Sequence, residues 1–170
     1  MRLHRGQLAS VSRAIVKALV DAEAIEVVSQ REVERDVEAV LGGYLSQTEQ
    51  VVSKARDLVQ QRGLPQGEFA RIKQLCAEQA GIKIGDDGLD YVLAQILEML
   101  MHSGNVEEVF AEDHDLKRHM RTFLRAEDDR DDQLEAEVRS KLRHVQEGSR
   151  MWEIEYARMK AEIKRRRGMS

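Results

Sequence analysis

The chain has 170 residues, of which 42% are hydrophobic, 34% are charged and only 4% are aromatic. A composition rich in Ala, Glu, Leu, Arg and Val, with Pro65 as the single proline, is typical of long helices and excludes collagen-like, porin-like and disulfide-stapled folds. The formal net charge of −4 argues against general binding to nucleic acid, although local charge carries more weight than the sum.

The sequence predicts a soluble, cytoplasmic protein. Cys76 is the only cysteine, so no internal disulfide is expected, and this favours a reducing compartment. No long apolar run follows the basic residues near the N-terminus, and no signal peptide is expected. The longest apolar stretch, near residues 96–101, is far shorter than the roughly 20 residues that cross a bilayer, so no membrane partner is expected.

Helical spacing begins early in the first half. Apolar residues of the first predicted helix are three or four positions apart: Leu8, Val11, Ile15 and Leu19. A short apolar run follows at residues 25–28. Ser29 and Glu32 then have the spacing of a capping box, which predicts the start of a second helix.

Glycines are expected to divide the rest of the first half. Gly42 and Gly43 are predicted to kink or interrupt the second helix, because glycine costs about 1 kcal/mol in a helix interior. Gly63 and Pro65 predict the end of that segment and the start of another helix. Cys76 falls on the apolar stripe of this helix and is interpreted as a core residue rather than a reactive thiol.

The second half begins with a turn-rich junction at residues 81–88, where Asp86 or Asp87 is predicted to cap the next helix. A short apolar and acidic run at residues 106–110 precedes a further helix, and residues 126–132 are interpreted as a solvated connector. Helical spacing then resumes.

The last predicted helix starts after Gly148 and Ser149, which have the pattern of a stop followed by a new N-cap. Its residues Trp152, Tyr156 and Met159 share one face. We interpret this stripe as core packing, and the alternative is an exposed stripe that binds a partner.

Residues 14–41 and 95–124 match as an internal repeat. An offset of 81 aligns the first helix and the short run of each copy, and an offset of 83 aligns the helix that follows. The aligned pairs include Ile15 with Ile96, Leu19 with Leu100, Val33 with Leu116, Val37 with Met120, Val40 with Phe123 and Leu41 with Leu124.

The repeat predicts an all-α fold of two pseudo-symmetric helical units, residues 1–82 and 83–170, packed together as one globule. Each unit is too small to have a generous core of its own. The runs at residues 25–28 and 106–109 are expected either to pair as a minimal two-stranded ribbon or to remain loops.

Charge is segregated along the second half. Residues 84–116 contain nine acidic residues and no lysine or arginine, whereas residues 150–170 contain seven basic and three acidic residues. The candidate partner-binding residues are Glu107, Glu108, Glu112, Asp113, Lys164, Arg165, Arg166 and Arg167. The favoured interpretation of the two charged regions is simple matching of helix dipoles, and the alternative is a pair of surfaces that recruit partners or meet in a homodimer.

No sequence pattern for catalysis or cofactor binding occurs, such as GxSxG, a P-loop, GxGxxG, HExxH or CxxC. His114 and His119 are five residues apart, which separates them by roughly 140° around a helix and does not favour a shared metal ion. We therefore expect no enzyme activity, no metal and no cofactor.

Three stretches resemble the bacterial family known as domain of unknown function 507: MRL at residues 1–3, SGNVEEVFAEDHDLKRHM at residues 103–120 and EGSRMWEIEYARM at residues 147–159. The likeness covers essentially the whole chain, and the second half resembles the shorter, single-copy members, in agreement with the repeat. The family has no established activity, so the resemblance implies no functional residue.

The chain is accordingly interpreted as a non-enzymatic protein-interaction or scaffolding module with an unidentified protein partner. The alternative is a nucleic-acid-associated protein that contacts phosphates through its basic C-terminal helix.

Overall fold

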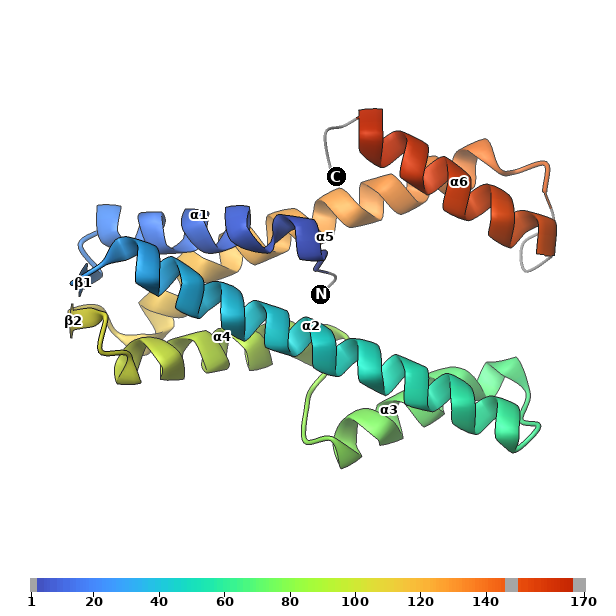
Figure 1. Ribbon diagram of the computed structural model, residues 1–170, viewed down its shortest axis with the longest axis horizontal. Coiled ribbons are helices and arrows are strands. Elements are labelled where there is room, and N and C mark those ends of the chain that lie inside the picture. The colour runs from blue at the N-terminus through green and yellow to red at the C-terminus, as the bar shows by residue number, and fades with distance from the viewer. Residues whose placement is uncertain (1–2, 146–149, 167–170) are drawn as a thin grey trace. The chain divides into compact units, whose positions relative to one another are not determined.

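The structure, a computed structural model, describes residues 3–145 and 150–166, except for the side chains at positions 66, 127, 128 and 131. The chain forms two compact units, one over residues 3–124 and one from residue 125 onwards (Figure 1). In chain order the elements are η1 (Arg5–Gln7), α1 (Leu8–Asp21), β1 (Ile25–Val27), α2 (Gln30–Gln61), η2 (Gln66–Glu68), α3 (Phe69–Gln79), α4 (Asp86–His102), β2 (Val106–Val109), α5 (Asp113–Lys141) and α6 (Arg150–Arg166).

The predicted all-α class with a minimal ribbon is confirmed. The boundary between the compact units falls within α5, between residues 124 and 125. The predicted helical units, residues 1–82 and 83–170, and the duplication from which they were inferred stay predictions. The element order does recur, because helix, strand and helix follow one another in α1–β1–α2 and again in α4–β2–α5.

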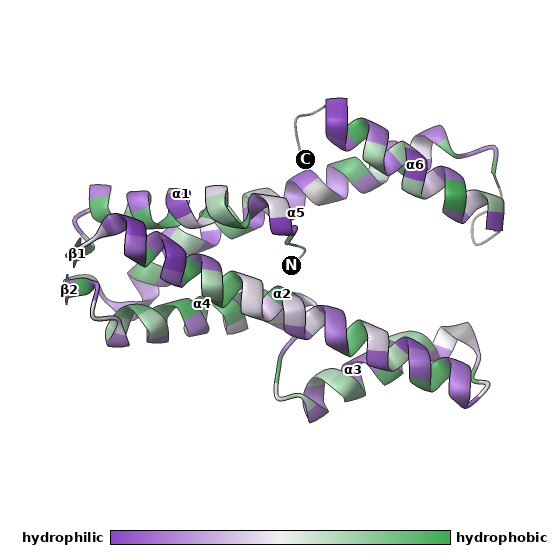
Figure 2. Ribbon diagram, viewed as in Figure 1, coloured by the Kyte–Doolittle hydropathy of each residue, from purple (hydrophilic) through white to green (hydrophobic). Residues whose placement is uncertain are grey.

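The main core of the first unit lies among α1, the first half of α2, α4 and the start of α5. Figure 2 shows hydrophobic and hydrophilic residues alternating along the helices, as expected of helices that bury one face. Aligned positions of the sequence repeat are buried in both copies. These include Ile15 and Ile96, Leu19 and Leu100, Val33 and Leu116, Val37 and Met120, and Leu41 and Leu124.

The two short apolar runs pair as an antiparallel ribbon, which decides between the ribbon and the loops that the sequence left open. Ile25 lies opposite Val109 and Glu26 opposite Glu108, with an irregularity in the register after Glu26. The backbone N–H of Val28 donates to the carbonyl of Asn105 at 2.9 Å and extends the pairing.

Asp36 of α2 holds the chain where it enters the second strand of the ribbon. Its carboxylate accepts hydrogen bonds from the Ser103 hydroxyl at 3.0 Å and from the Asn105 side-chain amide at 3.2 Å. The Ser103 hydroxyl in turn accepts from the backbone N–H of Asn105 at 3.2 Å. This network ties the loop between α4 and β2 to helix α2.

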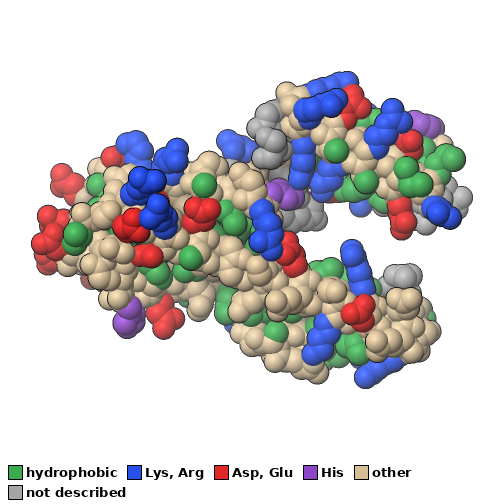
Figure 3. All heavy atoms as spheres, viewed as in Figure 1, with side chains coloured by type: hydrophobic (Ala, Val, Ile, Leu, Met, Phe, Trp, Pro, Cys, Tyr) green, Lys and Arg blue, Asp and Glu red, His purple; other side chains and the backbone are tan. Residues whose placement is uncertain are grey.

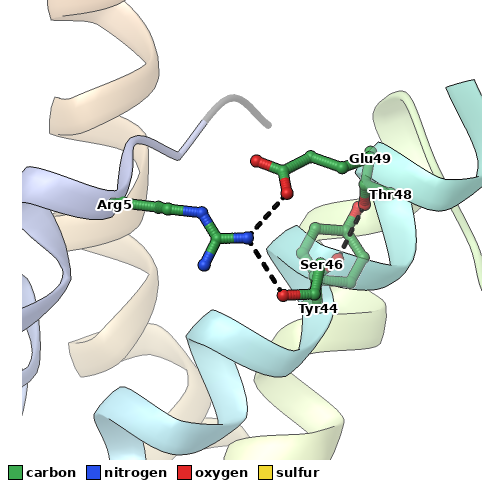
Figure 4. Close-up of polar contacts among 5 residues, drawn as sticks. All are labelled: Arg5, Tyr44, Ser46, Thr48 and Glu49. Atoms are coloured by element: carbon green, nitrogen blue, oxygen red, sulfur yellow. Dashed lines mark hydrogen bonds and ion pairs between the residues drawn. The ribbon is translucent and has the colours of Figure 1, made fainter. Parts of the chain in front are cut away.

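The N-terminal turn is held on the surface of α2 by Arg5 (Figure 4). Its guanidinium donates to the Glu49 carboxylate at 2.7 Å and to the Ser46 hydroxyl at 3.2 Å. One turn away, the Thr48 hydroxyl donates to the Tyr44 carbonyl at 2.9 Å. The ion pair is exposed, so its contribution to stability is below about 1 kcal/mol.

Helix α2 is continuous from Gln30 to Gln61, so the predicted interruption at Gly42 and Gly43 is wrong. The neighbours of these glycines explain the difference, because Leu41 is fully buried and Tyr44 is only 7% exposed. Burying two large side chains stabilises the helix here by more than the glycines destabilise it.

Gly43→Ala is expected to raise the free energy of unfolding by about 1 kcal/mol, because a Cβ at this position has no atom within 4 Å and alanine is the better helix former. Urea unfolding followed by circular dichroism measures the change. Gly42→Ala is the matched comparison. It makes the same substitution at the neighbouring position, but its Cβ would contact Leu8 Cδ1 at 3.5 Å instead of open space. An unchanged or lower stability of Gly43→Ala would contradict a regular helix at this point.

The observed N-cap agrees with the sequence-based prediction at α2 and differs from it at α4. The Ser29 hydroxyl accepts from the backbone N–H of Glu32 at 3.4 Å and caps α2 as predicted. The N-cap of α4 is Gly85, with φ of +67°, and not Asp86 or Asp87. Both aspartates occupy the first turn instead, where a negative charge is favourable to the helix dipole.

The second half of α2 packs against α3 around a separate apolar cluster of the first unit. Its buried residues are Val51, Ala55, Val59, Ile72, Cys76, Ala77 and Ile82. Cys76 is 2% exposed, which confirms its interpretation as a core residue.

The second unit is a hairpin of the C-terminal part of α5 and α6. Its buried residues are Leu134, Val138, Leu142 and Ile163. Trp152, Tyr156 and Met159 pack against them, which confirms that this stripe is core packing. The Trp152 and Tyr156 rings stack at 4.7 Å, and the predicted break at Gly148 and Ser149 lies outside the described residues.

Glu135 joins the two helices of this hairpin by accepting hydrogen bonds from the Tyr156 hydroxyl and from the Lys160 ammonium. Burial raises the pKa of the Tyr156 phenol above its ordinary value of 10.0, and the hydrogen bond to Glu135 acts in the same direction. The folded hairpin therefore holds this proton more tightly than the unfolded chain does.

The stability that this phenol contributes is complete below pH 10.0 and is lost as the pH rises through the folded pKa. We expect the free energy of unfolding of the hairpin to fall in this alkaline range, and Tyr156→Phe to flatten the fall. Trp152 fluorescence during urea unfolding measures it. The comparison with Tyr156→Phe isolates the phenol from other groups that lose protons at high pH. Parallel curves for the two proteins would contradict the assignment.

Candidate interaction site at the ribbon

A hollow of about 530 Å³ lies beside the ribbon of the first unit. It is formed where the end of α1, the first strand and the residue after the second strand meet. Its lining residues are Val20, Glu23, Ile25, Glu26, Val27 and Phe110. We call these six residues, together with the neighbouring Val28, Glu107, Glu108, Glu112 and Asp113, the ribbon site.

The turn after α1 shapes one wall of the hollow. Glu23 has φ of +52°, a left-handed conformation that is uncommon for a residue other than glycine. The N–H of Ala24 donates back to the Leu19 carbonyl at 2.9 Å and closes the helix. The Ala24 carbonyl then accepts from the N–H of Phe110 at 2.9 Å, so the same turn fixes the phenylalanine at the hollow.

Two large apolar side chains of the ribbon site are exposed. Phe110 is 57% exposed and Val28 is 67% exposed. Removing apolar surface from water contributes roughly 25 cal/mol per Å², so covering these side chains would be favourable to a partner. Both follow directly after a strand, where the ribbon holds the backbone in a fixed register.

The rest of the ribbon site is acidic. Figure 3 shows acidic side chains gathered around the end of the first unit that bears the ribbon. The six carboxylates, all exposed, belong to Glu23, Glu26, Glu107, Glu108, Glu112 and Asp113. None of these carboxylates forms an ion pair with a residue that the structure describes.

Two of the carboxylates face the same position of the ribbon. Glu26 and Glu108 are directly opposite each other in the antiparallel register, and like charges at such positions destabilise a strand pair. A cation placed between them would relieve this repulsion. The geometry therefore favours a positively charged ligand group at the ribbon.

The ribbon brings the four acidic candidates of the sequence together with two that sequence reasoning did not select, Glu23 and Glu26. Phe110 was also missed. A signal for it exists, because Val109 and Phe110 are adjacent apolar residues, and adjacent residues of an extended segment point to opposite sides. Val109 is half-buried, so Phe110 is left to face solvent.

The basic candidates lie in the last turn of α6, in the second unit. Lys164 is half-buried, and Arg165 and Arg166 are exposed. Arg166 forms an ion pair with Glu162 on the same helix. Arg167 lies outside the described residues.

Over residues 3–145 and 150–166, no three histidine, cysteine, aspartate or glutamate side chains converge as a metal site requires. Within the same residues, none of the helices combines the length and apolar character needed to cross a bilayer.

The protein-family model described as "Protein of unknown function (DUF507)" matches residues 1–169. No curated protein matches the chain.

Proposed function

The chain belongs to the DUF507 family, whose function is unknown, and we propose that it is a non-enzymatic protein-interaction module that docks a basic segment of a partner at the ribbon site. The observation that carries this proposal is the exposed ring of Phe110 at a hollow that is also lined by the carboxylates of Glu23 and Glu26. The partner segment combines an apolar anchor, which covers Phe110, with lysine or arginine side chains, which approach Glu26 and Glu108.

The physical chemistry of the ribbon site supports this assignment of roles. Apolar contact supplies most of the binding free energy, while charge selects the partner and raises the rate of encounter. Surface charges separated by more than about 8 Å are largely screened at physiological ionic strength, so binding weakens as salt is added. The opposed pair of Glu26 and Glu108 makes the ribbon site more favourable to a cationic segment than to a neutral one.

Nucleic-acid binding through α6 has weaker support. Three of its cations form ion pairs with nearby carboxylates, Arg158 with Glu155, Lys160 with Glu135 and Arg166 with Glu162. These pairs reduce the positive charge available to phosphates. If this second function holds, deleting residues 164–170 abolishes retention on RNA or DNA at low salt.

The docking function is tested with a fluorescent peptide that has a central leucine flanked by lysines, titrated with the full chain at low salt. Phe110→Ser is expected to weaken its affinity at least about tenfold, equivalent to roughly 1.4 kcal/mol. A peptide with glutamates in place of the lysines is expected not to bind.

Leu75→Ser is the matched control, because Leu75 is an exposed apolar residue of α3 outside the ribbon site. It should leave the affinity unchanged. Equal affinities of Phe110→Ser and the unmodified chain, or equal binding of the two peptides, would show that the ribbon site does not dock basic segments.

A further inference from the structure

Helix α6 has a second face that the hairpin core does not use. Trp152, Tyr156 and Met159 pack toward α5. Met151 is 68% exposed and Ile154 is 60% exposed. A rotation of about 100° per residue places these two on the side of the helix opposite the packed stripe.

The same face continues as a basic stripe. Arg158 lies four residues after Ile154, and Arg165 lies seven residues after Arg158, so both align with the exposed apolar pair. The Arg158 side chain is 74% exposed. Arg165 is exposed and forms no ion pair with any residue that the structure describes. We call Met151, Ile154, Arg158 and Arg165 the outer stripe of α6.

The outer stripe has the chemistry that the ribbon site requires of its ligand. It combines exposed apolar side chains with two arginines, of which Arg165 has no ion pair among the described residues and Arg158 has a 3.6 Å surface pair with Glu155. The ribbon site combines exposed apolar side chains with carboxylates that form no ion pair among the described residues. The large hydrophobic side chains that are exposed among the described residues are Val28, Leu75, Met101, Phe110, Met151 and Ile154. Four of these six belong to the two surfaces.

We propose that the partner docked at the ribbon site is the outer stripe of α6 from a second copy of this chain. This inference rests on the proposed docking function and names its partner. In the contact, Met151 and Ile154 cover Phe110 and Val28, and the arginines approach Glu26 and Glu108. An amphipathic helix laid into an acidic, partly apolar hollow is an established mode of recognition.

Every copy carries both surfaces, and in the proposed dimer each copy docks its outer stripe on the ribbon site of the other. A closed dimer of this kind has two-fold symmetry and leaves neither surface open for a third copy. The contact also removes the repulsion between Glu26 and Glu108, which the isolated chain retains.

The test uses reciprocal charge reversal in the full chain, followed by sedimentation velocity over a concentration series at low salt. The first variant is Glu107→Lys with Glu108→Lys, and the second is Arg158→Glu with Arg165→Glu. Each alone is expected to be monomeric at concentrations where the unmodified chain dimerises. Their equimolar mixture is expected to dimerise again, because each variant then meets an oppositely charged surface at both contacts.

Arg56→Glu with Arg62→Glu is the matched control for the second variant. It makes the same change of net charge as Arg158→Glu with Arg165→Glu, but at exposed positions in α2 and directly after it. It should dimerise as the unmodified chain does. Met151→Ser with Ile154→Ser is expected to prevent dimerisation without a change of charge. Circular dichroism confirms that each variant is folded.

A monomeric unmodified chain, unchanged dimers of the reversal variants, or a mixture that stays monomeric would overturn the proposal. A monomer that still binds the lysine-flanked peptide through Phe110 would overturn self-association while leaving the docking function in place. Charge reversals that alter the compactness of a monomer would show that α6 of the same chain covers the ribbon site, which also overturns the proposal.

Discussion

Leu134→Ala is expected to unfold the α5–α6 hairpin while the first unit stays folded. Leu134 is fully buried, and its cluster contains only three other buried residues, so the cavity has few neighbours that can collapse into it. Truncating a buried leucine costs about 3 kcal/mol, and a hairpin of this size has little more stability than that to lose.

The only tryptophan of the chain makes this result easy to separate from global unfolding. Trp152 packs on the hairpin core, so its fluorescence reports the hairpin, while circular dichroism reports all helices. In urea, the fluorescence transition of Leu134→Ala should move to lower concentration and leave most of the helical signal. Gln133→Ala changes an exposed neighbour and is the control. A single transition seen by both probes would contradict independent unfolding.

Gly88→Ala is expected to destabilise the first unit by about 2 kcal/mol, although alanine is normally the better helix residue. Gly88 is buried in the first turn of α4. A Cβ there would lie far inside van der Waals contact with the Tyr44 hydroxyl oxygen. That hydroxyl donates to the Lys83 carbonyl at 3.1 Å, so the added methyl group displaces a bonded, buried ring.

Tyr44→Phe provides the compensating change. It removes the oxygen that the methyl group meets, and the next ring atom, Cζ, lies 3.5 Å away, an ordinary contact. Alone it loses one hydrogen bond, at about 1 kcal/mol. Combined with Gly88→Ala it should give a protein more stable than Gly88→Ala alone, measured by thermal unfolding. A double variant no more stable than Gly88→Ala would place the strain elsewhere.

Local signals were sufficient to predict most helices. The cap at Ser29 and the core position of Cys76 depend on spacing within a few residues, and both are confirmed. The predicted interruption at Gly42 and Gly43 was wrong because it rested on helix propensity alone. The stabilisation from tertiary packing of the neighbouring side chains exceeds the cost of about 1 kcal/mol for glycine in a helix. A local sequence pattern does not reveal this packing.

The candidate site, like the fold, was only partly predictable from local sequence. The acidic residues of the ribbon site were selected because they form a run in the sequence, and charge can be counted without a structure. Glu23 and Glu26 were not selected, because the repeat offset of 81 relates the two runs but does not give their antiparallel register, in which Ile25 lies opposite Val109. The exposure of Phe110 depends on the same long-range register.

The separation of the two strands has a consequence for the order of events during synthesis. Helix α1 and the first half of α2 can complete their hydrophobic core only after α4 and the start of α5 have been synthesised. At about 5–20 residues per second, the ribosome takes roughly 3–12 s to add residues 62–124. Throughout this interval the nascent chain presents Ile15, Leu19 and Val37 without their later neighbours, so we expect it to be a client of ribosome-associated chaperones until the ribbon closes.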